Sequence, residues 1–460
     1  MEEFRRRGIE PNVYPIPADL LSKINLVISE KIQAVRKIAK EQKAAIGIIG
    51  GFVRDLLLGK PSQDVDFVVF GGDFNKLTLE IAKQTDSKIG KMSNTTLTTQ
   101  IRFKDGIVFE FNSARKEEYE FPNRTPKVSR GTIVDDLFRR DFTINSFVMF
   151  ENVYFDIFNG KDDLKNKIIQ TTREPELVFR EDYLRMFRAV RFSSKLNFNI
   201  AEEVKEGIRI NAKNIVDVPK ERTLSELTAS FTNDPVKTFK LMADLKLFET
   251  MFPDIRCKNL DETNYSPPNS WKKIEEKLQF LKSNNTNNIS IILAVILMET
   301  IIDDQSVNNH ESALVQKIDK QLRFFKFSNK ERNEIVFLVK NRNSLLDLIE
   351  GIPSKLELRQ AVRKLGEFLD AIILMTQAEL SVKVKKKGLP ALQNRLIEIR
   401  KTDELINFKL AIDGHEIEDL FGFKGQKIEQ IKTELLRAIM NEEIINSKET
   451  CIKYIKDKYT

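Results

Sequence analysis

The distribution of hydrophobic and polar positions changes character along the chain. Between residues 44 and 160, short runs rich in β-branched and aromatic residues are separated by Gly and Asp: AAIGIIGG, DVDFVVF, TTLTTQIRF, GIVFEF and NVYFDIF. Runs of this length and composition predict strands. From about Pro175 onward, apolar residues recur every three or four positions, as in EDYLRMFRAVRF and VKTFKLMADLKLF, which predicts amphipathic helices. The pattern therefore predicts an α+β fold, with a small sheet followed by an all-helical remainder.

Interruptions of the helical pattern predict further segments. Pro, Gly, Ser and Asn gather at Pro253 and at 265–270, 283–288 and 351–353, where they favour turns over helices. An amphipathic stretch from Asp19 to Gln42 precedes the strand region and predicts a packing helix. We therefore expect a helical extension, a sheet-bearing segment and three helical segments, at 1–43, 44–165, 166–235, 236–355 and 356–460.

Length and composition narrow the class of protein. At 460 residues, with 41% hydrophobic and 31% charged residues, the chain can build several cores and carries too much charge for a membrane protein. The longest apolar stretch, Ile289 to Met298, is about half of a bilayer span. The start MEEFRRRGIE lacks the apolar segment of a signal peptide. Cys257 and Cys451 lie far apart in the chain, which suits a reducing compartment. We expect a cytoplasmic protein with no membrane partner.

Charge and histidine content limit the possible chemistry. The 75 Lys and Arg against 68 Asp and Glu give a net charge of +7. This mild excess suits either a solvated surface or a partner with a phosphate backbone. The histidines are His310 and His415, and the two cysteines are too widely separated to suggest a zinc site. Any metal chemistry must therefore use carboxylates.

Two aspartates at the start of a predicted strand form the first candidate site. Asp64 and Asp66 stand two positions apart in DVDFVVF, so their carboxylates project from the same face of a strand. Carboxylate oxygens suit hard cations, and Mg²⁺ is the natural candidate because it keeps positions for water and phosphate. Glu110, in GIVFEF, is either a third carboxylate of this site or an ordinary strand residue. An isolated pair at this spacing is more often a solvated turn, so the neighbouring residues decide.

A glycine turn before this strand favours phosphate binding. Gly50 and Gly51 follow AAIGII and precede a predicted helix, FVRDLLLG. Because glycine has no Cβ atom, backbone N–H groups there can approach a triphosphate, and a helix N-terminus favours anions. Arg54 lies within the first turns of that helix. The glycine turn and the paired carboxylates together indicate a site for a triphosphate and a divalent cation.

Two later segments combine carboxylates with arginines. In RRDFTIN, Asp141 and Asn145 share a face of a predicted helix at i,i+4, with Arg140 beside them. In EDYLR, Asp182 and Arg185 stand at i,i+3 on a predicted helix, and further arginines continue that face, Arg188 and Arg191. Taken singly, each segment is as readily explained by a surface ion pair.

Five segments in this order resemble the motifs of one enzyme family. GGFVRDLLLG with DVD is similar to the first motif of the class II tRNA nucleotidyltransferases and bacterial poly(A) polymerases, which belong to the nucleotidyltransferase superfamily. RRDFTIN, DIFNG, EDYLR and the Glu221-Arg222 segment with SEL resemble the following four. The chain departs from the family at Ser146, where alanine is usual, and at KIGKMSN, which lacks the usual Gly-Thr turn. Five motifs in order are far more specific than any one of them.

The resemblance implies an architecture and a reaction. It implies a nucleotidyltransferase head with a small mixed sheet at 44–165, a nucleotide-reading and RNA-binding neck, a helical body, and a tail that binds tRNA. The reaction would add C, C and A to the 3′ end of tRNA from CTP and ATP, releasing pyrophosphate, with Mg²⁺ as cofactor. Asp64, Asp66 and Glu110 would be catalytic, and the two aspartates would hold the metal. The nucleotide would be bound by Gly50, Gly51, Arg54, Arg140, Asp141, Asn145, Asp182, Arg185, Arg188 and Arg191.

The Asp182 and Arg185 pair would also choose the base. A carboxylate accepts hydrogen bonds and a guanidinium donates them. Cytosine and adenine present an amino group next to a ring nitrogen acceptor, whereas uracil and guanine present a carbonyl next to an N–H. The pair would therefore accept C and A and oppose U and G, because each mismatched buried polar group costs roughly 1–3 kcal/mol.

Other functions would use the same motifs. An enzyme that adds only CC lacks part of the loop that ARKEEYEFPNRTPKVSRGTIVDD fills here, and IRFKDGIVFEF lacks the histidine expected of poly(A) polymerases. Addition of A alone stays open, as does, from another class, a catalytically silent RNA-binding protein. SVKVKKKG would grip the tRNA backbone or form a solvated face. The sequence leaves the oligomeric state open.

Overall fold

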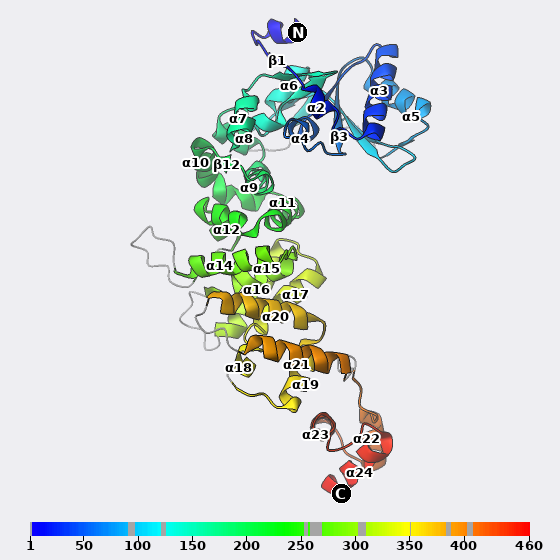
Figure 1. The fold of residues 1–460 in the computed structure, drawn as a ribbon, viewed down its shortest axis with the longest axis vertical. Helices are drawn as coiled ribbons and strands as arrows, with labels where there is room; N and C mark the ends of the chain where they lie inside the picture. The colour runs from blue at the N-terminus through cyan, green and yellow to red at the C-terminus, as the bar shows by residue number, and fades with distance from the viewer. Residues whose placement is uncertain are drawn as a thin grey trace. The chain divides into compact units, whose positions relative to one another are not determined.

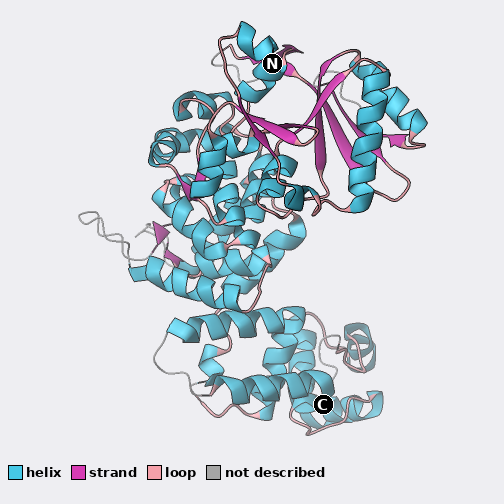
Figure 2. Ribbon diagram, turned by 45° about the horizontal axis from the view of Figure 1, so that its top comes forward, coloured by secondary structure: helices cyan, strands magenta, loops and turns pink. Residues whose placement is uncertain are grey.

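The computed structural model describes residues 2–90, 97–120, 126–252, 256–257, 269–301, 310–349, 351–382, 388–402 and 408–460. The chain divides into two compact units, Met1–Met251 and Phe252–Thr460. The main sheet lies in the first unit, and the second is mostly helical (Figure 2). The predicted α+β fold is therefore confirmed, whereas the finer division into extension, head, neck, body and tail remains a prediction.

One mixed sheet of eight strands forms the centre of the first unit. Its order is β1-β10-β9-β2-β3-β6-β5-β4. Strands β3 and β6 run parallel, and every other neighbouring pair in this sheet is antiparallel. In chain order the strands are β1 (Asn12–Pro15), β2 (Ala45–Ile49), β3 (Val65–Gly71), β4 (Lys88–Ile89), β5 (Thr98–Arg102), β6 (Val108–Ser113), β9 (Val148–Phe150) and β10 (Val153–Asp156).

Side chains alternate between the two faces of this sheet, and different helices pack on each face. Helices α3 (Leu26–Glu41) and α5 (Phe74–Gln84) pack together on one face (Figure 1), where Phe67 of β3 stacks on Phe111 of β6. Because side chains alternate along a strand, Asp66 and Val68 point to the opposite face. Val68 there joins a core with residues of α1 (Glu2–Arg6) and α6 (Ile133–Phe138). Asp66 therefore lies on the face that α3 and α5 leave uncovered.

A buried carboxylate shapes the turn that leads out of the sheet. Asp156 is 2% exposed and accepts backbone N–H groups from Phe158 at 3.1 Å, Gly160 at 3.0 Å and Lys161 at 2.9 Å. A Cβ atom on Gly160 would lie 2.6 Å from the carbonyl oxygen of Thr143, which is closer than real Cβ contacts come. The DIFNG segment thus forms a tight turn that rests directly on the RRDFTIN segment.

Helices complete the first unit. A small β-hairpin, β7 (Arg115–Glu118) with β8 (Lys127–Arg130), precedes α6. A single 3₁₀ turn, η1 (Thr143–Asn145), follows α6. A two-stranded parallel pair joins β11 (Ile168–Ile169) to β12 (Asn199–Ile200). The remaining helices are α2 (Ala18–Leu21), α4 (Gly51–Leu57), α7 (Gly160–Asn166), α8 (Pro175–Glu181), α9 (Leu184–Leu196), α10 (Glu202–Asn211), η2 (Ala212–Asp217), α11 (Lys220–Asn233), α12 (Pro235–Asp244) and α13 (Leu247–Met251).

The structure differs from the sequence predictions in three local elements. The segment 1–43 is not wholly helical, because Asn12–Pro15 forms β1 and pairs with β10 at the edge of the sheet. The helix predicted over RRDFTIN is the single turn η1. The helix predicted through EDYLR is broken at Asp182, whose backbone is extended at φ −150° and ψ 104° between α8 and α9.

In its described residues, the second unit consists of helices with one short strand pair. Near its end, Ile412, Ile417, Ile431, Leu435, Cys451 and Ile455 form a small separate core. Lysines 383 and 385–387 of SVKVKKKG lie outside the described residues. The elements are β13 (Arg256–Cys257), α14 (Asn269–Ser283), α15 (Ile289–Leu297), β14 (Thr300–Ile301), α16 (His310–Phe324), α17 (Asn329–Lys340), α18 (Leu346–Ile349), α19 (Lys355–Leu365), η3 (Gly366–Phe368), α20 (Leu369–Val382), α21 (Leu389–Thr402), α22 (Gly414–Phe421), α23 (Gln426–Met440) and α24 (Lys448–Tyr459).

Helix α15 is the most apolar of these helices, but it is short. Across the described ranges, no helix is both long enough and apolar enough to span a bilayer.

Candidate active site

Three carboxylates lie near the start of the parallel strand pair. Asp64 immediately precedes β3, Asp66 is its second residue, and the register places Glu110 of β6 directly beside Asp66. The pKa of Asp66 is raised to about 6 by burial, by Glu110 and by Asp64, while Arg140 opposes the shift. Burial contributes most to this shift, and the negative charges of Glu110 and Asp64 add to it, which Arg140 offsets only in part.

This surplus of negative charge fits a cation. The available donors are carboxylate oxygens, which suit hard divalent ions. Within the described part of the chain, no three Asp, Glu, His or Cys side chains are close enough to ligate one ion together. Asp64 and Asp66 would therefore hold a metal with water or phosphate oxygens in the other positions. Glu110 is partly engaged, since its carboxylate accepts a hydrogen bond from Nδ2 of Asn112 at 3.1 Å.

The glycine turn lies against these carboxylates. Gly50 has a φ of +78°, a conformation that favours glycine. A Cβ atom there would lie 3.2 Å from Nη1 of Arg140 and 3.8 Å from Oδ2 of Asp66. Gly51 begins α4 directly after it. The turn thus brings the N-terminus of α4, the guanidinium of Arg140 and the carboxylate of Asp66 together.

Arg54 lies within α4, as the sequence predicted, and its side chain makes contacts inside the protein. Its side chain is 3% exposed and donates to Oδ1 of Asn145 at 2.6 Å and to Oδ1 of Asp55 at 2.7 Å. Its guanidinium also lies 5.1 Å from the centre of the Phe192 ring. Arg54 therefore fixes the side chain of Asn145 by a hydrogen bond. Its direct contact with a nucleotide remains a prediction.

Asp136 joins the two arginines of the RRD segment. Arg139 donates to Oδ1 of Asp136 at 2.9 and 2.6 Å, and Arg140 donates to Oδ2 at 3.2 and 3.1 Å. Burial pushes the pKa of the Asp136 carboxyl upward, but Arg140 and Arg139 together hold it below its ordinary value. Sequence analysis missed this residue. An acidic position four residues before Arg140 on a short helix was the only signal.

Asp141 is a second buried and ionised carboxylate. It accepts hydrogen bonds from Nε of Arg188 at 2.6 Å, from Nδ2 of Asn145 at 3.3 Å and from the backbone N–H of Phe142 at 2.8 Å. Burial, the largest single influence, would raise the pKa of Asp141, but Arg188, Arg185 and Asn145 together lower it to about 2. The predicted contact between Asp141 and Asn145 is therefore present, although the 3₁₀ turn η1 brings it about and not an α-helix.

Phe192 packs among three guanidinium groups. Arg54, Arg188 and Arg191 lie 5.1, 5.3 and 4.3 Å from its ring centre. Glu226 of α11 accepts a hydrogen bond from Arg191 and lies 3.7 Å from Arg188. Cations are attracted to an aromatic face at these distances. Phe192 and Glu226 were not among the predicted site residues. Glu226 lies on α11, whereas its arginine partners lie on α9, and Phe192 is joined by Arg54 from α4.

The Asp182 and Arg185 side chains do not bond to each other. Asp182 accepts the backbone N–H of Leu184 at 3.0 Å and Nη2 of Arg222 at 2.8 Å. Arg185 donates to the Glu181 carboxylate and to two backbone carbonyls, those of Val178 and Arg139. The predicted shared helical face is wrong, because the chain is extended at Asp182 and α9 begins only at Leu184.

Asp182 and Arg185 nevertheless line one cavity of about 490 Å³. Its walls come from the β7–β8 hairpin, from the α8–α9 junction and from the start of α11, and consist of Arg115, Glu117, Tyr119, Pro126, Arg139, Glu181, Asp182, Tyr183, Arg185, Asp217, Val218, Pro219 and Arg222. Small-molecule sites commonly have this volume. Of the five N–H groups of Arg185, three are used in the contacts above, which leaves two donors for a ligand.

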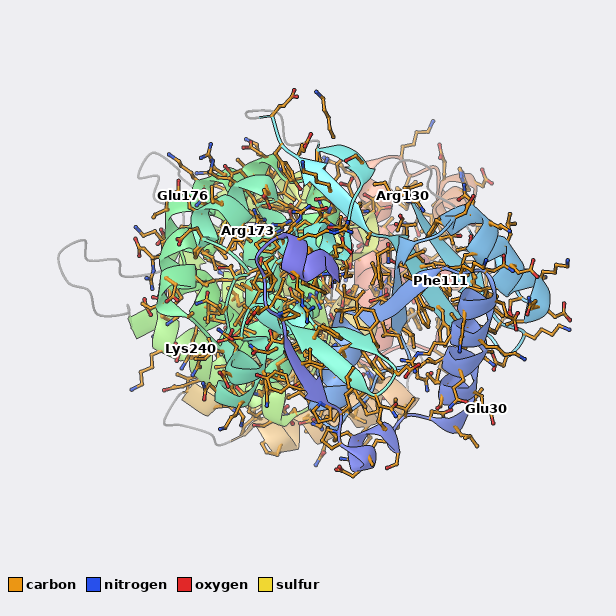
Figure 3. All side chains as sticks on the ribbon, turned by 90° about the horizontal axis from the view of Figure 1, so that it is seen from above. Glu30, Phe111, Arg130, Arg173, Glu176 and Lys240 are labelled. Atoms are coloured by element: carbon orange, nitrogen blue, oxygen red, sulfur yellow. The ribbon has the colours of Figure 1, made fainter. Side chains whose placement is uncertain are left out.

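Glu181 fixes Arg185 from behind. Arg173 donates to both oxygens of Glu181 at 2.8 and 2.6 Å, and Nη1 of Arg185 donates to the same carboxylate at 2.8 Å. Figure 3 labels Arg173, which lies inward, and Glu176, which lies at the outer edge of the following helix. The structure thus places an acceptor and a donor on the wall of one cavity, and the carboxylate of Asp66 beside the glycine turn.

Two protein families match consecutive segments of this chain, and several known enzymes match most of it. The family described as "Poly A polymerase head domain" matches residues 46–170, and "Probable RNA and SrmB- binding site of polymerase A" matches residues 197–258. The CCA-adding enzyme of Lactobacillus helveticus is 28% identical over 89% of this chain and 92% of its own length. That of Pediococcus pentosaceus is 32% identical over 58% of this chain and 70% of its own length. An A-adding tRNA nucleotidyltransferase of Aquifex aeolicus is 26% identical over 85% of this chain, but over 45% of its own length.

Solved structures share the fold. The Thermotoga maritima CCA-adding enzyme complexed with tRNA has a TM-score of 0.65 at 21% identity, covering 97% of this chain and 99% of its own. The Bacillus stearothermophilus CCA-adding enzyme in complex with CTP has a TM-score of 0.60 at 22% identity, covering 94% and 97%. With the head and RNA-binding segments matched in order, this chain belongs to the family of class II tRNA nucleotidyltransferases and poly(A) polymerases.

Proposed function

We propose that this protein adds C, C and A to the 3′ end of tRNA from CTP and ATP, with release of pyrophosphate. The observation that carries the proposal is the 490 Å³ cavity in which Asp182 and Arg185 offer an acceptor and a donor. The CCA-adding relatives, matched over most of their length, support the same reaction.

Base choice follows from the polarity of these two side chains. A cytosine or adenine amino group can donate to the Asp182 carboxylate, while the neighbouring ring nitrogen accepts from one of the two remaining N–H groups of Arg185. Uracil and guanine would place a carbonyl against the carboxylate and an N–H against the guanidinium. No nucleic-acid template is needed, because the protein itself supplies the complementary groups.

The carboxylates and the glycine turn support the transfer step. Enzymes of this family use divalent metal ions, and we infer that Mg²⁺ bound at Asp64 and Asp66 activates the 3′-hydroxyl and neutralises charge on the pyrophosphate. Arg140, held by Asp136 beside Gly50, would bind phosphate oxygens with its remaining donors. Glu110 adds negative charge that strengthens cation binding at Asp66.

Two alternatives use parts of the same site. An A-adding enzyme would have the same cavity, and tRNA substrates distinguish it from a CCA-adding enzyme. A catalytically silent RNA-binding protein would have no need for carboxylates that repel one another at the sheet end.

A cytoplasmic location remains a prediction from composition.

The function is tested with tRNA transcripts that end before the first C, before the second C and before A. We expect purified protein to extend all three to a complete CCA end when CTP, ATP and magnesium are present. Extension of only the transcript that ends before A would show an A-adding enzyme. Binding of tRNA without extension of any transcript would support the silent RNA-binding alternative.

Metal dependence should vary with pH because the pKa of Asp66 is about 6. Below that pH a proton replaces the cation at Asp66, so metal affinity should fall as pH falls, by up to about tenfold per pH unit. The measurement is the rate of C addition as a function of magnesium concentration, at several pH values from about pH 5 to about pH 8, which spans the range where Asp66 titrates. Excess magnesium should restore the rate at low pH. If the loss of rate at low pH were the same at every magnesium concentration, Asp66 would not be a metal ligand.

Base selection should depend on Asp182. In Asp182→Ala, the carboxylate can no longer receive the cytosine amino group or repel the uracil carbonyl. The preference for CTP over UTP, measured as the ratio of kcat/KM in single-nucleotide incorporation, should fall about ten- to a hundredfold. Glu176→Ala, on the exposed surface of α8, is the matched control. An unchanged preference in an active Asp182→Ala variant would place base selection elsewhere.

A further inference from the structure

Both oxygens of Asp182 are already engaged before any base is present. Oδ1 accepts the backbone N–H of Leu184 at 3.0 Å, a contact fixed by the turn into α9. Oδ2 accepts Nη2 of Arg222 at 2.8 Å. The Leu184 contact lies within the backbone turn, so a base that enters the cavity meets the oxygen that Arg222 occupies.

Arg222 is attached more loosely than the arginines around it. Its side chain is 53% exposed and Asp182 is 27% exposed, whereas Arg185 is 9% exposed and bonds to three groups. Arg222 stands in the first turn of α11 and lines the same cavity as Asp182 and Arg185. Ion pairs between exposed side chains contribute little, and breaking one changes an equilibrium by at most about fivefold. Arg222 can therefore be displaced at small cost.

We propose that Arg222 is an internal competitor of the incoming base for the Asp182 carboxylate, and so a residue that sets base specificity. The inference rests on the proposed function, in which Asp182 reads the base. Nucleotide binding exchanges one donor for another: the N–H of Arg222 leaves Oδ2, and an amino group of the base takes its place.

The competition affects correct and incorrect bases differently. Cytosine and adenine bring an amino group, so the carboxylate keeps a hydrogen-bond donor throughout the exchange. Uracil and guanine bring a carbonyl at that position, which cannot replace the guanidinium and leaves the Asp182–Arg222 pair closed. Binding of a correct base therefore includes the small cost of displacing Arg222, whereas an incorrect base cannot displace Arg222 from Asp182.

This competition predicts an effect opposite to that of a supporting contact. If Arg222 competes, its removal frees Oδ2 and strengthens binding of CTP and ATP. If Arg222 instead holds Asp182 in position for the base, its removal weakens both. The two roles are therefore distinguished by the sign of the change.

The test is nucleotide binding and single-nucleotide incorporation by Arg222→Ala, with CTP, ATP and UTP as probes. We expect the Kd of CTP and ATP to fall about two- to fivefold and the Kd of UTP to stay the same or rise. Arg222→Lys keeps a donor at this position and should lie close to wild type. Arg209→Ala is the matched control, because Arg209 also forms exposed ion pairs in the first unit but does not line the cavity.

The difference between Arg222→Ala and wild type should shrink at high salt, since an exposed ion pair is screened. An increase in the Kd of CTP, or no change in any of the three, would overturn the inference while leaving the proposed function in place. Failure of the wild-type protein to extend any tRNA transcript would instead overturn the proposed function.

Discussion

One buried carboxylate, Asp136, holds two guanidinium groups that serve different parts of the site. Arg140, on one of its oxygens, reaches the glycine turn and donates to the carbonyl of Asn145 at 3.4 Å. Arg139, on the other oxygen, lies 3.5 Å from Glu117 of the β7–β8 hairpin, and its carbonyl accepts a hydrogen bond from Arg185. Leaving one partner of a buried ion pair without the other costs about 3–5 kcal/mol. The end of the sheet and the base cavity therefore depend on the same contact.

Burial alone does not decide how the carboxylates of this site titrate. Asp66 and Asp141 are both largely buried, yet the pKa of Asp66 is raised to about 6 and that of Asp141 is lowered to about 2. Asp66 has two carboxylates as neighbours, whereas Asp141 has the guanidinium of Arg188. The first environment is suited to a cation that binds and leaves, and the second to a permanent structural ion pair.

Much of this site could be predicted because its spacing is local or follows from strand geometry. Asp64 and Asp66 are two residues apart, and Glu110 was recognised because its strand reads clearly and runs beside β3. Asp136 also has local spacing to Arg139 and Arg140, but such pairs are common on helix surfaces and nothing in the sequence marks this one as buried. Phe192 could not be found in this way, because one of the three guanidinium groups around it comes from α4.

The break at Asp182 shows the limit of local reasoning. EDYLR has good helix-forming composition, and the i,i+3 spacing predicted a pair. The fold instead extends the chain at Asp182, so that its carboxylate faces Arg222, forty positions further along. Tertiary contacts override propensity at this point, and Asp182 lines the cavity together with Arg222.

Asp136→Asn tests the central claim most directly, since it keeps the shape of the side chain and removes the charge that both arginines share. The measurement is the ratio of kcat/KM for CTP and UTP, on protein shown to be folded by its circular dichroism. We predict that C addition and the preference for CTP both fall by about tenfold, because Arg140 loses its ionic partner and so does Arg139, whose backbone carbonyl accepts a hydrogen bond from Arg185. A folded variant that is slower but discriminates between CTP and UTP as well as wild type would contradict the link between the two parts of the site.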